Sequence, residues 1–208
     1  MPITHLEFFL EEPSAEVALT NIVPKIVGPN LTCAFHPFQG KRDLLTNLPN
    51  RLRALHSWIP AEWGLVVLVD QDQENCVDLK GQLEAIAQAA RFDTKTSRQS
   101  RAPYKLLNRV VVEELEAWLF GDVPALVQAY PGVPLTLDKK APFRNPDAIR
   151  GGTWEALERV LQKAGHHKGG LQKYKAAADI SSRMSPDQNR SGSFCVFRDG
   201  LRALVDEN

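Results

Sequence analysis

Strand-like and helix-like apolar patterns alternate along the first two-thirds of the chain. Short apolar runs indicate buried strands, and apolar residues at every third or fourth position indicate covering helices. The alternation predicts a parallel, four-stranded α/β sheet with right-handed crossovers and helices on its faces, because strands and helices follow one another in turn. We expect strands at 3–10, 31–38, 65–69 and 110–112, and helices at 15–27, 44–59, 75–91 and 113–120.

Only helical patterns follow, interrupted by an irregular, proline-rich segment at 131–152. Helices are expected at 123–130, from Thr153 onward, at 171–184 and at 193–205. We therefore predict an α/β core over 1–122 and a helical C-terminal region over 123–208 that packs on it. These helices either cover one face of the sheet or form a small lobe.

Acidic residues follow three of the four expected strands. They are Glu11 and Glu12, Asp70 and Asp72, and Glu113, Glu114 and Glu116. The carboxyl ends of parallel strands meet at one edge of a sheet, where ligands bind. Asp70 and Asp72 point the same way on an extended backbone and repel each other unless a cation neutralises them.

A carboxylate-rich site suits hard cations such as Mg²⁺ or Mn²⁺, which clamp phosphate oxygens and activate water. The competing interpretation is that acidic residues at helix N-termini only complement the helix dipole. The direction of Glu114 also stays open. A helix that begins at Glu113 puts Glu113 and Glu116 on one face, whereas a longer strand puts Glu114 on the side of Val112.

Basic residues supply candidate contacts to phosphate. His36 and the turn Gln39-Gly40-Lys41-Arg42 end the second strand. Gly40 permits close backbone approach, and Lys41 and Arg42 are candidate phosphate ligands, unless this is an ordinary turn with solvated bases.

A polar, basic loop over 94–105 contains Tyr104 and Lys105. It either contacts a nucleic-acid backbone and stacks a base, or is only solvated. Trp58, Trp118 and Trp154 lie on apolar stripes and are expected in the core.

Composition adds few restrictions. The 25 basic and 25 acidic residues balance, and the three cysteines are too scattered for a disulfide framework or a CxxC zinc site. No apolar run reaches the ~20 residues of a membrane span, and early glutamates interrupt any signal peptide, so we expect a cytoplasmic protein. No GxxxxGK[ST] loop occurs, so any ATP would be bound by a separate partner.

Two segments resemble the Toprim domain, the catalytic fold of topoisomerases, primases and nucleases of the overcoming-lysogenization-defect class. They are Phe8-Phe9-Leu10-Glu11-Glu12-Pro13-Ser14-Ala15-Glu16 and the strand that ends in Asp70-Gln71-Asp72. Glycine usually follows the Toprim glutamate, whereas Glu12 stands here, so either Glu11 or Glu12 takes that role.

Nearly the whole chain resembles an uncharacterised bacterial family, catalogued as domain of unknown function 4276. The resembling segments are 10–16, 36–45, 69–72, Glu113-Glu114-Leu115-Glu116-Ala117-Trp118, 151–155 and 193–200. The resemblance implies a Toprim-like fold and, through related proteins, a place in phage defence beside an AAA- or ABC-type ATPase.

Carried over residue by residue, the resemblance gives Glu11 or Glu12 the role of general acid/base or metal ligand. Asp70 and Asp72 would hold the metal, with Glu114 and Glu116 as further ligands or orienting groups. The expected function is divalent-metal-dependent hydrolysis of phosphodiesters in nucleic acid. The alternatives are a non-catalytic partner of an ATPase with a degenerate Toprim site, and an enzyme acting on a small phosphorylated molecule.

Overall fold

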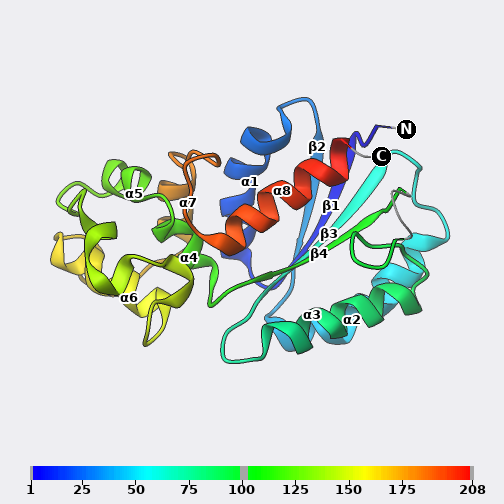
Figure 1. Cartoon of the computed structure of the whole chain (residues 1–208), viewed down its shortest axis with the longest axis horizontal. Helices are drawn as coiled ribbons and strands as arrows, with labels where there is room; N and C mark the ends of the chain where they lie inside the picture. The colour runs from blue at the N-terminus through cyan, green and yellow to red at the C-terminus, as the bar shows by residue number, and fades with distance from the viewer. Residues whose placement is uncertain (1, 99–102, 207–208) are drawn as a thin grey trace.

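A four-stranded, all-parallel sheet forms the centre of the computed structural model, which describes residues 2–98 and 103–206 (Figure 1). The strands are β1 (His5–Leu10), β2 (Thr32–Pro37), β3 (Trp63–Asp70) and β4 (Leu106–Val111), in the order β2-β1-β3-β4. The predicted parallel α/β sheet is therefore confirmed. β4 begins earlier than expected, at Leu106. The apolar pattern missed its first half because Asn108 and Arg109 interrupt the run of apolar residues.

Helices cover both faces of the sheet. They are α1 (Pro13–Val27), α2 (Lys41–His56), α3 (Cys76–Ala89) and α8 (Gly192–Asp206). Successive side chains of a strand point to opposite faces. Phe8 and Val66 accordingly pack in the core layer of α1 and α8, and Phe9 and Val67 pack in the layer of α2 and α3. Burial on both sides explains why β1 and β3 read as continuous apolar runs.

The remaining elements extend beyond the carboxyl edge of the sheet as a helical lobe (Figure 1). They are α4 (Leu115–Phe120), α5 (Val123–Ala129), the short 3-10 turns η1 (Leu137–Lys139), η2 (Ala141–Phe143) and η3 (Pro146–Ala148), α6 (Thr153–Lys163) and α7 (Lys173–Ser181). Both alternatives for the C-terminal region thus occur, because α5–α7 belong to the lobe whereas α8 returns to the sheet. The boundary at residue 122 stays a prediction.

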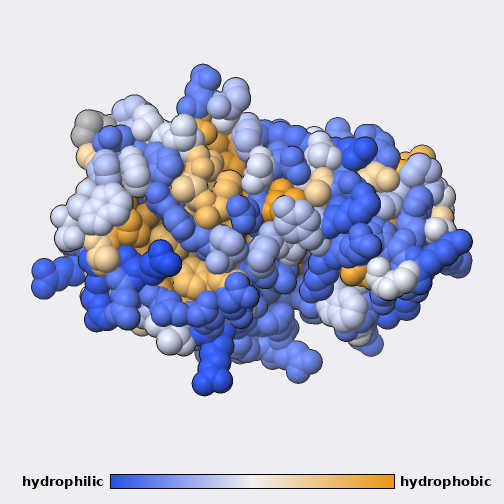
Figure 2. Space-filling model, turned by 180° about the vertical axis from the view of Figure 1, so that it is seen from behind, coloured by the Kyte–Doolittle hydropathy of each residue, from blue (hydrophilic) through white to orange (hydrophobic). Residues whose placement is uncertain are grey.

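One buried hydrophobic cluster joins the lobe to the sheet. It runs from α1 and α8 through Trp118 to Leu157 of α6 and Ile180 of α7. Lys25 of α1 adds a polar link, because its Nζ donates to the carbonyl oxygens of Ser181, Ser182 and Met184 at the end of α7. Seen from behind, apolar side chains gather over the half that contains the sheet, and the lobe is mostly polar (Figure 2).

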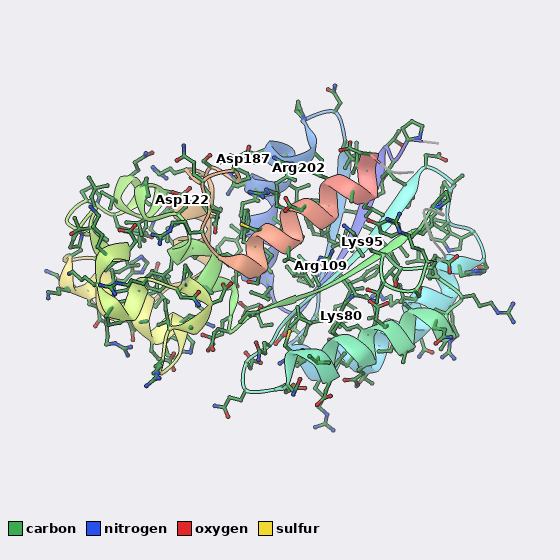
Figure 3. All side chains as sticks on the ribbon, in the orientation of Figure 1. Lys80, Lys95, Arg109, Asp122, Asp187 and Arg202 are labelled. Atoms are coloured by element: carbon green, nitrogen blue, oxygen red, sulfur yellow. The ribbon has the colours of Figure 1, made fainter. Side chains whose placement is uncertain are left out.

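Charged side chains protect the edge strand β4. Lys80 Nζ and Arg109 Nη1 each donate to the carbonyl oxygen of Asn108, at 3.0 Å. Figure 3 shows Arg109 on the α8 side of β4 and Lys80 on the α3 side. Charged groups on an edge strand discourage pairing with another chain.

Among the helices of the described residues, none combines the length and the apolar character that a membrane span requires.

Gly121, which follows α4, is packed too tightly to accept a side chain. A Cβ there would lie 2.0 Å from Oδ1 of the buried Asn189, whose Nδ2 donates to Trp118 O at 2.8 Å. We expect Gly121→Ala to lower the free energy of unfolding by about 2–3 kcal/mol, through overpacking and the loss of this hydrogen bond.

Gly81→Ala is the matched control, because a Cβ at this position in α3 would meet nothing within 4 Å. This variant should raise stability by about 1 kcal/mol, through better helix propensity and a less flexible unfolded chain. Urea unfolding measures both changes. Equal effects of the two substitutions would refute the packing described at Gly121.

Candidate functional site

The chain reverses its direction of travel across the sheet between β1 and β3. From β1 it crosses to β2 by α1 on one face, and then returns to β3 by α2 on the other face. Ligands of open α/β sheets bind at the carboxyl ends of the strands, at such switch points. Glu11 directly follows β1 and Asp70 ends β3, and the backbone N–H of Asp70 donates to Glu11 Oε2 at 3.1 Å. Two sequence-predicted site residues therefore meet at this point.

Six carboxylates gather around the switch point, and we call them the acidic cluster. They are Glu11, Glu12, Asp70, Asp72, Glu114 and Glu116. Burial, and then the neighbouring charges of Glu11 and Glu116, raise the pKa of Asp70 well above its ordinary value. Burial likewise raises the pKa of Glu11, and it raises the pKa of Glu116 to about 7. The cluster therefore favours the binding of a proton or a cation.

Glu11 and Glu12 differ in their partners. Glu11 contacts the Asp70 backbone, whereas Glu12 Oε1 accepts a hydrogen bond from Ser14 Oγ in the first turn of α1. On the α4 side, Asp70 Oδ2 accepts from the backbone N–H of Leu115 at 3.3 Å. Glu116 is 3% exposed, and its Oε2 has no hydrogen-bond partner among the described residues.

Glu114 follows neither of the two expected arrangements. Glu113 takes a left-handed turn with φ of 64°, Glu114 is extended, and α4 begins at Leu115. The Glu114 carboxylate caps α6, because Oε2 accepts from Thr153 N at 3.0 Å, Thr153 Oγ1 at 2.7 Å and Trp154 N at 3.1 Å. Thr153 is the first residue of α6, and Gly152 stands at the N-cap position.

The Lys41 ammonium contacts three residues of the turn that follows β3. It lies 2.7 Å from Asp72 Oδ2 and 3.2 Å from Glu74 Oε1, and it donates to Gln71 O at 3.1 Å. Burial alone would lower the pKa of Lys41, but the hydrogen bonds to Asp72 and Glu74 raise it above its ordinary value. The structure therefore places Lys41 where it holds Asp72 in a left-handed conformation with φ of 52°. Arg42 is exposed beside it.

Lys173 of α7 belongs to the site but was not anticipated from sequence. Its Nζ lies 3.9 Å from Glu116 Oε1 and 5.5 Å from the centroid of the Trp154 ring. Burial would lower the pKa of Lys173, but the charges of Glu116, Glu12 and other cluster members raise it. A lysine far along the chain gives no local signal, because only the folding of the lobe brings it here.

The structure places the expected basic loop away from the acidic cluster. Lys105 precedes β4, and its Nζ donates to the carbonyl oxygens of Pro60, Ala61 and Trp63 at the amino end of the sheet. Tyr104 is 1% exposed, so it cannot stack on a base as expected. Residues 99–102 of this loop lie outside the described residues.

The tryptophans also differ from one another. Trp118 is buried as expected, but Trp58 is 58% exposed. Trp154 lines a cavity and is not part of the core. The expectation of a core position for all three was wrong, because an apolar stripe does not say which of its residues lies at the rim of a layer.

Two adjoining cavities form a groove beside the acidic cluster. On the lobe side it is a cavity of about 840 Å³, lined by Asp72, Glu114, Gly152 and Trp154 among others. On the other side, a cavity of about 510 Å³ is lined by Lys41, Arg42, Thr46 and Gln82. Asp72 and Glu74 line both cavities. Of the acidic cluster, Asp72 and Glu114 line these cavities.

The donor groups of the cluster fit a hard divalent cation by their chemistry. All are carboxylate oxygens, and the buried, unpartnered Oε2 of Glu116 is available to a cation or a proton. No three acidic, histidine or cysteine side chains within the described ranges already stand in positions that could hold one metal ion. Carboxylates of the cluster must therefore rotate to bind one.

The fold and site define an α/β protein with a carboxylate-rich site at the switch point of a parallel sheet. The chain belongs to the family described as Domain of unknown function (DUF4276), which matches residues 10–202. Comparison with curated proteins found no match, and neither did comparison with solved structures.

The raised pKa of Glu116 makes stability depend on pH. The folded state binds the Glu116 proton more tightly than the unfolded chain does, so stability falls as pH rises from 4.5 to about 7. The resulting cost above pH 7 is about 3 kcal/mol. Glu116→Gln should therefore be more stable than the wild type at pH 8, by up to about this amount, and nearly equal to it at pH 4.

Urea unfolding at several pH values measures the difference between the two proteins. Parallel stability curves from pH 4 to 8 would contradict a buried, proton-binding Glu116.

Proposed function

We propose that this protein hydrolyses phosphodiester bonds of nucleic acid with Mg²⁺ or Mn²⁺, as a Toprim-like nuclease. The observation that carries the proposal is the meeting of Glu11 and Asp70 at the switch point of the sheet, inside an under-neutralised acidic cluster. Such clusters at strand ends suit two tasks, holding a hard cation and exchanging protons with a reacting group.

In this proposal Glu11 and Asp70 hold the metal, with Asp72 and Glu116 beside them. The bound cation supplies Lewis-acid activation of water and neutralises phosphate oxygens. Glu11 takes the glutamate role rather than Glu12, because Glu11 contacts the Asp70 backbone and Glu12 binds Ser14. Glu114 acts as a positioning residue, because its carboxylate caps α6 and so fixes the lobe beside the site.

The basic residues take different roles. Lys41 positions Asp72, and Lys173 balances the charge of Glu116. Arg42, which is exposed and makes no ion pair within the described chain, lines the groove and holds a substrate phosphate. The groove extends through two adjoining cavities, which favours a polymer over a small phosphorylated molecule. We also propose a separate ATPase as partner and a role in phage defence, as expected from the resemblance.

Asp70→Asn tests the metal site with little change of shape. Asparagine keeps an acceptor for Leu115 N but removes the charge that burial makes costly. We expect Mg²⁺-dependent nicking of plasmid DNA or of RNA to fall by roughly 100-fold, and Mn²⁺ affinity in calorimetry to fall at least about tenfold, while the melting temperature rises.

Asp78→Asn, an exposed carboxylate in the first turn of α3, serves as the matched control and should keep wild-type cleavage. Equal cleavage by Asp70→Asn and the wild type, or cleavage that survives chelation of the metal, would overturn the proposal.

Arg42→Ala tests the phosphate contact. Loss of one phosphate contact should weaken the binding of DNA and RNA without regard to sequence, and reduce the slope of log affinity against log salt by about one. Fluorescence anisotropy at several salt concentrations measures the slope. Arg53→Ala, on the same helix but outside the groove, should leave it unchanged.

A further inference from the structure

A second group of interacting polar side chains lies on the neighbouring strands β1 and β2. Glu7 of β1 is 8% exposed, and its carboxylate bridges two imidazoles. Oε1 lies 3.0 Å from His5 Nε2, and Oε2 is hydrogen-bonded to His36 Nε2. None of these three residues belongs to the acidic cluster.

This bridge fixes both the ring and the tautomer of His36. A carboxylate only accepts hydrogen bonds, so the hydrogen must sit on His36 Nε2. The ring also stacks on Phe9, with centroids 5.3 Å apart and planes 20° apart. Nδ1 has no partner within the described part of the chain, so the neutral ring with hydrogen on Nε2 can accept a further hydrogen bond there. A buried carboxylate that orients a histidine in this way prepares its other nitrogen as an acceptor.

The His36 ring lines a cavity of about 570 Å³ between the end of β2 and α2, which we call the His36 cavity. This volume is typical of sites for small molecules. The polar side chains Asp43, Asn47, Asn50 and Arg51 of α2 line it together with Gln39.

The chemistry of the lining defines the ligand. Carboxamides donate and accept hydrogen bonds at once, as sugar hydroxyls do. The single cation Arg51 is offset by the single carboxylate Asp43, which already accepts from Gln39 N and Asn47 Nδ2. The lining therefore favours a neutral ligand over a charged one.

We propose that the His36 cavity binds a small, neutral, polyhydroxylated molecule, namely the ribose of a nucleoside, and that one hydroxyl donates to His36 Nδ1. The site is independent of the proposed nuclease function, because its lining contains no member of the acidic cluster.

Nitrogen NMR of the histidine rings of the full-length protein tests the site with adenosine, ribose and 2′,3′-dideoxyadenosine. The free protein should show His36 with hydrogen on Nε2. Adenosine and ribose should shift the Nδ1 signal with saturation. Dideoxyadenosine should bind at least about tenfold more weakly, because it leaves polar groups of the cavity unpaired.

His36→Gln keeps an amide donor for Glu7 but lacks Nδ1, so it should weaken adenosine binding about tenfold without a loss of melting temperature. His56→Gln, at the exposed end of α2 outside the cavity, is the matched control. Asp70→Asn should bind adenosine as the wild type does, which separates this proposal from the nuclease proposal.

Four results would overturn the inference. They are no saturable binding of adenosine or ribose, equal binding of dideoxyadenosine, unchanged binding by His36→Gln, and hydrogen on Nδ1 of His36. The dideoxyadenosine comparison and the tautomer need only the wild-type protein, so they hold even if a variant fails to fold.

Discussion

Crowding of carboxylates at one edge of a buried parallel sheet is the constraint on which this structure depends. Desolvated like charges repel one another, and the chain offsets the repulsion with ammonium groups from two distant segments. Lys41 comes from α2, and Lys173 comes from the lobe. The lobe also supplies the N-terminus of α6 to the Glu114 carboxylate. Its place beside the sheet edge is thus set by charge as well as by the shared hydrophobic cluster.

The sheet, its parallel direction and the acidic strand ends could be read from the sequence, because both signals are local. A continuous apolar run indicates a strand that is buried on both faces. The residues that directly follow such a strand lie at the carboxyl edge of the sheet, where ligands bind. Lys173 and the cap formed by Glu114 could not be predicted, because each depends on a contact between segments far apart in sequence. Lys105 was expected to contact a substrate because its loop is basic, whereas its ammonium donates to a carbonyl oxygen at the amino end of the sheet, a contact that the sequence does not reveal.

Two chemically different sites arise at the same sheet edge. The acidic cluster lies between β1 and β3, where carboxylates outnumber their cationic partners. The His36 cavity lies beside β2, where the charges in its lining balance and a buried glutamate orients an imidazole. The acidic cluster follows the ends of β1 and β3, and His36 lies next to the end of β2. Function belongs to the side chains of a site and not to the fold that holds them, and in this protein those side chains are the acidic cluster and the lining of the His36 cavity.

Anomalous X-ray diffraction from crystals grown with Mn²⁺ is the most direct test of the metal-binding claim. The account predicts one manganese peak in contact with the carboxylates of Glu11 and Asp70, absent from Asp70→Asn crystals grown in the same way. A wild-type crystal without manganese at the acidic cluster, or a peak that persists there in Asp70→Asn, would contradict it.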